Sequence, residues 1–285
     1  MTIAVAAKFP WGALNNLIPA NVVIPESVIL ASDSRYSRQT ATGYVPSSDS
    51  GTKLFQIGRD VAGVYAGVSR IGEICFDTLR RNLGRQSSPT SDTSKRIAQQ
   101  TFNKVYRHEI AVMRLNPDQA PLYILIGACN NAGNAELFRF SYQNNFVPVT
   151  VEGLDVLGWE QTSLKFIELL TGELHKKVEE ELALRRKYTQ IPMAQMSPMP
   201  IADGQVAILV VAMLRSLIEE GSNTTIGGNI QLAQITKDGL IFPSVSFTTN
   251  PTNDGPGWTR ATANGATLHT VTGISGGLGI YHSSE

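Results

Sequence analysis

Charge is scarce in this chain of 285 residues: charged side chains make up 17% of it, below the roughly 25% of an ordinary soluble domain. The 24 basic and 24 acidic side chains cancel, so the formal net charge is zero. A nucleic-acid-binding protein needs a basic face that releases phosphate counterions. We therefore expect no nucleic-acid partner. Because 42% of the residues are hydrophobic, the chain can bury a sizeable core, which excludes global disorder.

Cysteine and histidine are also rare. The two cysteines, Cys75 and Cys129, lie among apolar neighbours, which favours two buried free thiols in a reducing compartment over a disulfide or a metal pair. The four histidines are dispersed, with no ligand spacing such as HExxH. We expect neither a metal nor a cofactor.

Long hydrophobic runs are absent as well. No apolar stretch reaches the ~18 residues that a membrane-spanning helix needs. The first residues have no basic segment ahead of an apolar one, and Lys8 and Pro10 interrupt them, so we expect no signal peptide. These features predict a cytoplasmic protein that does not associate with membranes.

The hydrophobic pattern predicts strands, two helices, strands, two helices and strands, in that order. The expected strands are 2–9, 28–36, 53–57, 61–66, 122–129, 136–141, 146–152, 228–236 and 240–242. The expected helices are 71–85, 92–113, 161–186 and 203–220. Residues 10–27, with three prolines, are predicted to form an inserted loop, and residues 39–51 a second loop rich in Ser, Thr and Gly.

Two antiparallel sheets packed face to face between helical layers would bury the apolar face of every element. The sequence therefore predicts an α+β protein, a four-layer αββα sandwich, in a single domain over residues 2–248. Residues 249–285 are rich in Gly, Thr and Ser. We expect a C-terminal tail or arm there, with room for a docked strand around Leu278.

Thr2 suggests covalent chemistry. Removal of Met1 is favoured by a small following side chain, and it would leave threonine with a free α-amine beside its own hydroxyl. An α-amine has a pKa of about 7.7–8.0, so one residue can supply both nucleophile and general base. A Met-Thr start is common, however, and by itself it indicates only an ordinary initiator sequence.

Three later positions would complete such a site. Asp33 ends an apolar strand, Lys53 opens Lys53-Leu-Phe-Gln-Ile57, and Gly67 follows Lys53 by fourteen residues. With the Thr225–Gly239 segment and its Gly-Gly and Asp-Gly pairs, this pattern resembles the proteasome-type threonine peptidases over roughly residues 2–245. The Met-Thr opening without a propeptide is most similar to the ancestral β-subunit (Anbu) group.

The resemblance implies a role for each residue. Thr2 would be the nucleophile and its amine the base, Lys53 would support the alkoxide and relay protons, and Asp33 would keep Lys53 charged. The N–H of Gly67 would donate to the oxyanion. By analogy, Tyr65 and Ser69 would line the specificity pocket. Without the resemblance, Asp33 and Lys53 indicate only an ion pair, and Gly67 only a tight turn.

The resemblance also implies an N-terminal-nucleophile hydrolase fold and a substrate that is a peptide or an unfolded protein. It further implies self-association into a ring or a helical oligomer, and in some members a separate ATP-dependent unfoldase partner.

Three positions depart from the family pattern. Trp159 stands where a Ser-Gly pair would place its serine, and a later Asp-x-x-Ser-Gly reads Asn223-Thr-Thr-Ile-Gly227. Asn223 thus replaces the acid and Ile226 the serine, which bears on whether the site turns over.

Two alternatives remain open. The chain could be a non-catalytic proteasome-like scaffold that retains Met1, or an amidase that uses the same nucleophile on a small molecule. A GxSxG match at Gly273–Gly277 is a rival nucleophile motif, but it lacks the strand-turn-helix context and the acid that such a serine requires.

Overall fold

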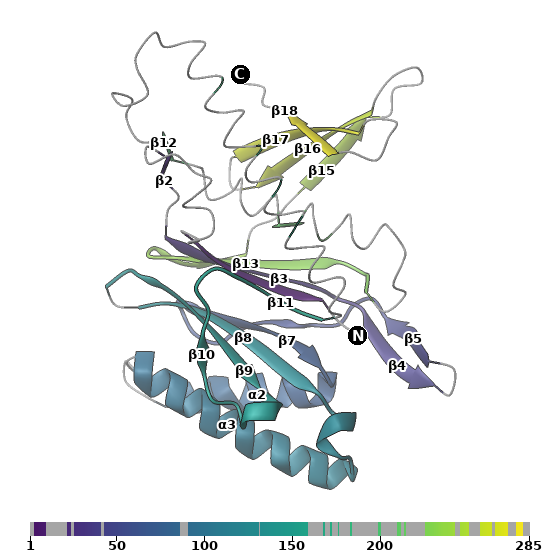
Figure 1. Cartoon of the computed structure of the whole chain (residues 1–285), viewed down its shortest axis with the longest axis vertical. Coiled ribbons are helices and arrows are strands. Elements are labelled where there is room, and N and C mark those ends of the chain that lie inside the picture. The colour runs from purple at the N-terminus through teal and green to yellow at the C-terminus, as the bar shows by residue number, and fades with distance from the viewer. Residues whose placement is uncertain are drawn as a thin grey trace.

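The computed structural model describes residues 3–9, 22–23, 26–40, 43–85, 91–130, 132–158, 199–200, 226–242, 246–250, 257–263, 266–272 and 278–281, with single positions 168, 172, 176, 183, 210, 211 and 214. Within these residues the protein is a mixed α/β structure with antiparallel sheets and two long helices, α2 and α3 (Figure 1). None of its described helices is long and apolar enough to cross a membrane.

The first sheet has five antiparallel strands in the order β11-β1-β3-β13-β14. Their bounds are β11 (Leu154–Leu157), β1 (Ala4–Phe9), β3 (Ser27–Asp33), β13 (Ile230–Thr236) and β14 (Gly239–Ile241). The central strand β3 is rich in Val, Ile and Leu and is buried at every position. Such a run is typical of a strand that is covered on both faces.

The second sheet also has five antiparallel strands, in the order β10-β9-β8-β7-β6. Their bounds are β10 (Val149–Thr150), β9 (Ala135–Ser141), β8 (Leu122–Cys129), β7 (Val61–Gly67) and β6 (Leu54–Gln56). Figure 1 shows the two sheets stacked, with α2 and α3 below the second one.

An apolar core lies between the sheets and contains residues of both, among them Val28 and Leu30 of β3 and Ala62, Val64 and Ala66 of β7. These residues alternate along their strands because successive side chains point to opposite faces. Gly127 marks a close approach: a Cβ there would lie 2.6 Å from Val28 Cγ1. A larger residue at position 127 would push the sheets apart.

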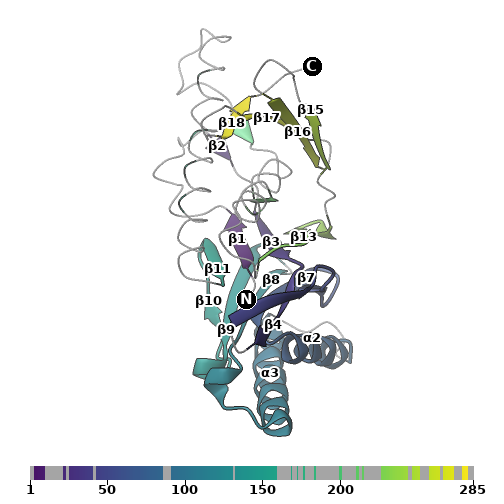
Figure 2. The same ribbon diagram turned by 90° about the vertical axis from the view of Figure 1, so that its right-hand side faces the viewer.

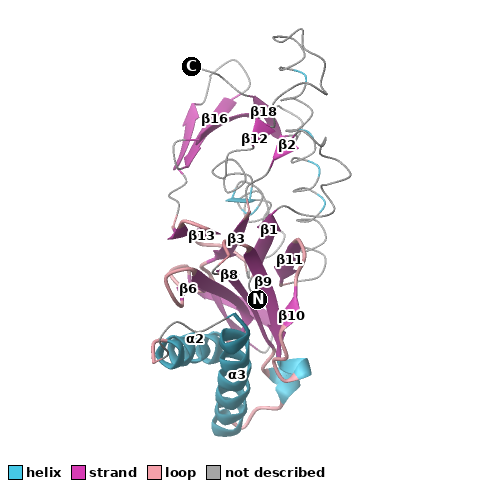
Figure 3. Ribbon diagram, turned by 90° about the vertical axis from the view of Figure 1, so that its left-hand side faces the viewer, coloured by secondary structure: helices cyan, strands magenta, loops and turns pink. Residues whose placement is uncertain are grey.

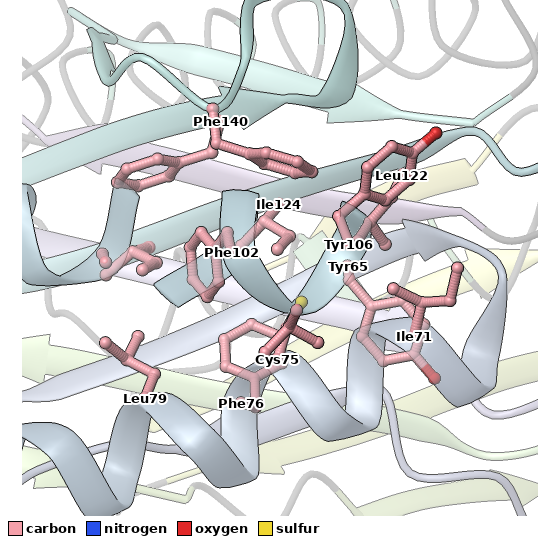
Figure 4. Packing of buried hydrophobic residues seen from close by; sticks show 14 of the residues in the cluster. Tyr65, Ile71, Cys75, Phe76, Leu79, Phe102, Tyr106, Leu122, Ile124 and Phe140 are labelled. Carbon is pink, nitrogen blue, oxygen red and sulfur yellow. The ribbon is translucent and has the colours of Figure 1, made fainter. Parts of the chain in front are cut away.

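The other face of the second sheet is covered by α2 (Ser69–Leu83) and α3 (Ser91–Met113), as Figures 2 and 3 show from two sides. Ile71, Cys75 and Leu79 recur at helical spacing and are buried against the sheet. Aromatic side chains fill this layer, including Phe76, Phe102 and Phe140 (Figure 4). The helices predicted at 71–85 and 92–113 are therefore confirmed within two residues at each end.

The outer face of the first sheet is buried as well. Ile3, Val5, Ile29 and Leu232 point to this face and are at most 6% exposed. The helices predicted at 161–186 and 203–220 lie outside the described residues except at single positions. Three of these, Val210, Val211 and Leu214, are helical and buried.

Two predicted strands differ from the structure. The strand predicted over 28–36 stops at Asp33. A hairpin of β4 (Tyr36–Thr40) and β5 (Gly43–Ser48) then occupies most of the stretch at 39–51 that was predicted to be a loop. The strand predicted over 146–152 is wrong for most of its length, because Asn145 and Phe146 adopt positive φ of 54° and 57° and end the 3-10 turn Tyr142–Asn144.

The predicted C-terminal tail or arm contains regular structure. A four-stranded antiparallel sheet is formed by β15 (Ser246–Asn250), β16 (Gly257–Ala263), β17 (Ala266–Thr272) and β18 (Leu278–Tyr281). Ala263 of β16 pairs with Ala266 of β17, and the sequence between them is Asn264-Gly265, the dipeptide preferred in two-residue hairpins. Two short strands, β2 (Val22–Val23) and β12 (Met199–Pro200), pair in parallel. The rest of the insertion predicted at 10–27 lies largely outside the described residues.

Candidate functional site

The candidate site lies at one end of the two stacked sheets. Asp33 is the last residue of β3, Ile3 directly precedes β1, and Lys53 directly precedes β6. Because β1 and β3 are antiparallel, the start of one lies beside the end of the other: Ile3 O accepts from Asp33 N at 3.3 Å. The topology thus gathers chain segments that the sequence keeps far apart.

Asp33 and Lys53 form a buried ion pair. Lys53 Nζ lies 2.9 Å from Asp33 Oδ1, and the two side chains are 1% and 0% exposed. The carboxylate also accepts two backbone hydrogen bonds, from Ile3 N to Oδ1 and from Gly227 N to Oδ2, each 3.1 Å long. Three donors therefore converge on one carboxylate, which compensates for its removal from water.

Lys53 is held at both ends. Its ammonium donates a second hydrogen bond to Arg35 O and lies 5.8 Å from the centroid of the Tyr36 ring. Its backbone N–H donates to Gln231 Oε1 at 2.9 Å, and the same oxygen accepts from Leu54 N at 3.0 Å. A side chain that would otherwise occupy many rotamers thus has one position.

Burial acts in opposite directions on the two groups. It raises the pKa of Asp33, against the opposing effect of the nearby Lys53 ammonium. It lowers the pKa of Lys53, against the opposing effect of the Asp33 carboxylate. Both shifts follow from the cost of a charge in a low-dielectric interior. The Lys53 ammonium therefore releases a proton more readily than it would without burial, which suits a proton relay.

A second ion pair supports the first. Arg35 donates to both carboxylate oxygens of Asp49, from Nε to Oδ1 at 2.6 Å and from Nη2 to Oδ2 at 2.9 Å. It also donates from Nη1 to Ile226 O at 3.2 Å, and its backbone N–H donates to Gly227 O at 3.0 Å. We call these four residues (Arg35, Asp49, Ile226 and Gly227) the Arg35 clamp. It keeps Gly227 N in place to donate to Asp33.

Glycine is required next to the clamp. Gly228 has a φ of +75°, and a Cβ there would lie 2.5 Å from Ser34 Oγ. That hydroxyl accepts from Asn229 N at 2.8 Å. The Gly227-Gly228 pair therefore allows the 226–229 segment to lie directly on the turn that follows β3.

Gly67 ends β7 at the same end of the molecule. In the β6–β7 ladder Leu54 pairs with Val64, so continuing this register places Tyr65 opposite Lys53 and Gly67 opposite Gly51, two positions before Lys53. Its φ is +131°, and a Cβ would lie 2.0 Å from Pro121 O. No other residue fits this backbone.

The two predicted pocket residues differ in their surroundings. Ser69 begins α2 and is half-buried. Tyr65 has no exposed surface, and its ring packs against Phe76 and against Gly72, where a Cβ would lie 2.6 Å from the ring. Direct contact between Tyr65 and a substrate would require this side chain to leave the core.

Several predicted positions lie outside the described residues: Thr2, Trp159, Asn223 and the Gly273–Gly277 segment. Ile226 is described and buried, and its carbonyl takes part in the Arg35 clamp. Both cysteines are free thiols, Cys75 buried and Cys129 half-buried. Over the described ranges, no group of three His, Cys, Asp or Glu side chains is placed to hold a metal ion.

Sequence reasoning assigned no role to Arg35, Asp49, Gly227 or Gln231. Gly227 and Gln231 lie within the Thr225–Gly239 segment that carries the resemblance, so a signal for that segment existed. Arg35 and Asp49 carried none, because their ion pair joins the turn after β3 to the residue after β5.

In comparisons with known proteins, no family model matches the chain and no curated protein matches it significantly.

Proposed function

We propose that the protein is a threonine-type peptidase of the proteasome kind, with Thr2 as nucleophile after removal of Met1. The observation that carries the proposal is the fully buried Asp33–Lys53 pair, whose carboxylate accepts from the backbone N–H of Ile3. Thr2 is joined to that nitrogen by a peptide bond. Its hydroxyl and α-amine are therefore attached one residue from the pair.

The proposed reaction proceeds through an ester. The Thr2 hydroxyl attacks the carbonyl carbon of a peptide bond and gives its proton to the α-amine, and the charged Lys53 stabilises the developing alkoxide. The Gly67 N–H donates to the tetrahedral oxyanion. The carbon–nitrogen bond then breaks as the protonated α-amine donates its proton to the leaving nitrogen. Water hydrolyses the acyl-enzyme ester, which releases the acid and restores the hydroxyl.

The same proposal includes the four-layer αββα arrangement of N-terminal-nucleophile hydrolases. It is supported by the burial of the first sheet on both faces and by the helical, buried positions Val210, Val211 and Leu214. Two helices over 161–186 and 203–220 would supply the fourth layer.

Assembly, partners and location belong to the proposal too. We expect a homo-oligomer, a ring or a helix, that encloses the sites in the cytoplasm. Its substrates would be peptides or unfolded proteins, delivered in some settings by an ATP-dependent unfoldase.

The test begins at the N-terminus. Intact mass should show loss of Met1, and an electrophilic inhibitor that reacts with an N-terminal threonine should add to Thr2. Peptide hydrolysis should disappear in Thr2→Ala, while the circular dichroism spectrum stays unchanged. Hydrolysis that survives in Thr2→Ala would place the activity elsewhere and refute the proposal.

A scaffold without activity is the second candidate, and the buried Ile226 in place of the family's serine favours it. Retained Met1 with no inhibitor adduct would identify the scaffold, because the acylated nitrogen of residue 2 cannot act as a base. Hydrolysis of small amides by a monomer, shown by light scattering, would indicate the amidase alternative.

A further inference from the structure

A cavity of about 290 Å³ lies between the two helices and the second sheet, away from the candidate site. Its apolar walls include Leu79 and Leu83 of α2, Ala98 of α3, and Val61 and Phe138 of the sheet. Val61 begins β7 and Gly67 ends it. Six residue steps along a strand span roughly 20 Å, so this cavity and the candidate site are separate places.

Two opposite charges belong to the walls of this cavity, Lys95 and Glu136. Lys95 Nζ lies 4.6 Å from the centroid of the Phe138 ring and 2.9 Å from Asp92 Oδ1. Because the Asp92 side chain is 94% exposed, this pair is weak and can exchange its partner. The Glu136 carboxylate accepts from Asn130 Nδ2 at 3.2 Å. Glu136 and Phe138 point to the same face of β9, about 7 Å apart.

We propose that this cavity binds a small zwitterion with an apolar side chain, namely a free amino acid whose side chain is branched or aromatic. The carboxylate of the ligand lies beside Lys95, its ammonium beside Glu136, and its side chain among Leu79, Leu83 and Phe138. The volume is at the lower end of the range for small-molecule sites, roughly 300 Å³, which suits a single amino acid. The inference goes beyond the proposed function and does not depend on it.

The first experiment compares four probes by titration calorimetry. The probes are L-phenylalanine, hydrocinnamate (which lacks the ammonium), phenethylamine (which lacks the carboxylate) and glycine (which lacks the side chain). L-Phenylalanine should bind at least tenfold more tightly than each of the others. Equal binding of hydrocinnamate or phenethylamine would overturn the zwitterion class, and absence of binding by L-phenylalanine would overturn the site.

The second experiment uses variants. Lys95→Gln and Glu136→Gln should each weaken L-phenylalanine binding about tenfold or more, because each removes one charged contact. Arg96→Gln is the matched control: it removes a neighbouring exposed charge on α3 that is not part of the wall, and binding should not change. Ala98→Phe should fill the cavity and abolish binding. If that variant fails to fold, the two Gln variants still decide the matter, since unchanged affinity in both refutes the assignment.

Discussion

Burying an ammonium and a carboxylate costs several kcal/mol per ion, and their attraction offsets this only when the remaining polar atoms are satisfied. Asp33 and Lys53 meet that condition through Ile3 N, Gly227 N and Arg35 O. An apolar pair could fill the same space, so stability alone gives no reason for the ions. The contacts do fix the Lys53 ammonium at one point, which is what the proposed role of Lys53 beside Thr2 requires.

Lys53→Met should destabilise the protein by roughly 3–5 kcal/mol, because it leaves the Asp33 carboxylate buried without its counter-ion. The pKa of this carboxyl is ~3.9 in the unfolded chain. Above that pH the buried carboxyl of the variant would still hold a proton in the folded state, whereas the unfolded chain would have lost it. Stability of the variant should therefore fall as the pH rises above ~4. Urea unfolding at pH 5 and pH 8 measures this.

The matched control is the double variant Asp33→Asn with Lys53→Met, which has no charge to bury. It should recover part of the lost stability and show little dependence on pH. Equal stability of Lys53→Met at both pH values would contradict the account.

Gly67→Ala should cost roughly 3 kcal/mol or more, since its φ of +131° and the 2.0 Å approach of a Cβ to Pro121 O are both incompatible with a side chain. Gly58→Ala is the control: its Cβ would meet Val61 Cβ at an ordinary 3.8 Å, and the change should be neutral or stabilising by up to ~1 kcal/mol. Thermal unfolding compares the two. Similar melting temperatures would refute a requirement for glycine at position 67.

At the scale of elements, the hydrophobic periodicity of the sequence predicted those helices and strands that bury one regular apolar face. The α2 and α3 helices and the strands β7, β8, β9 and β13 could be predicted within about two residues because each buries a regular apolar face. The β4–β5 hairpin could not, since its strands are polar and β5 contains Pro46. The strand predicted over 146–152 was wrong at Phe146, because this buried aromatic residue lies in a turn with positive φ.

Tyr106 joins α3 to the 3-10 turn Pro117–Gln119 that follows it, and this link should be sensitive to alkali. Its hydroxyl donates to Ala120 O at 3.0 Å and Pro117 O at 3.2 Å. Burial raises its pKa to about 12, whereas the unfolded chain loses this proton near pH ~10. Between these values the folded state binds more protons, so the stability from Tyr106 is present below pH ~10 and is lost as the pH rises toward 12.

Tyr106→Phe tests this link. The variant should be less stable than the parent by about 1 kcal/mol at pH 9, where one hydrogen bond is lost. The gap should close as the pH is raised to 11. Guanidinium unfolding at both pH values measures it, and a gap independent of pH would show that the hydroxyl does not titrate as described.

At the scale of the whole molecule, the candidate site combines segments that the chain separates widely. The proximity of Asp33 and Lys53 could be predicted through a resemblance in spacing, whereas the role that the resemblance implies for Gly67 stays a prediction. The contacts of Asp33 with Gly227 and of Lys53 with Gln231 could not be predicted, because they depend on the register of β3 with β13, nearly 200 residues later. Local patterns carry no information about such a pairing.

Arg35 is where this long-range assembly can be tested. Lysine keeps the charge but cannot make the two parallel hydrogen bonds to Asp49 together with a third to Ile226 O. Arg35→Lys should therefore loosen the 226–229 segment and weaken the Gly227 hydrogen bond to Asp33, while Lys53 stays paired. We expect a loss of about 1–2 kcal/mol in unfolding free energy. Hydrogen exchange should be faster in a peptide covering residues 226–236.

Arg38→Lys provides the comparison, because Arg38 is an exposed residue of β4 three positions along the same segment. It should leave exchange over 226–236 unchanged. Faster exchange in both variants would mean that any change of arginine in this segment disturbs the fold. Unchanged exchange in Arg35→Lys would mean that β13 and the glycine pair dock without the clamp. Only a selective effect of Arg35→Lys would show that the docking of residues 226–236 depends on the side chain of Arg35.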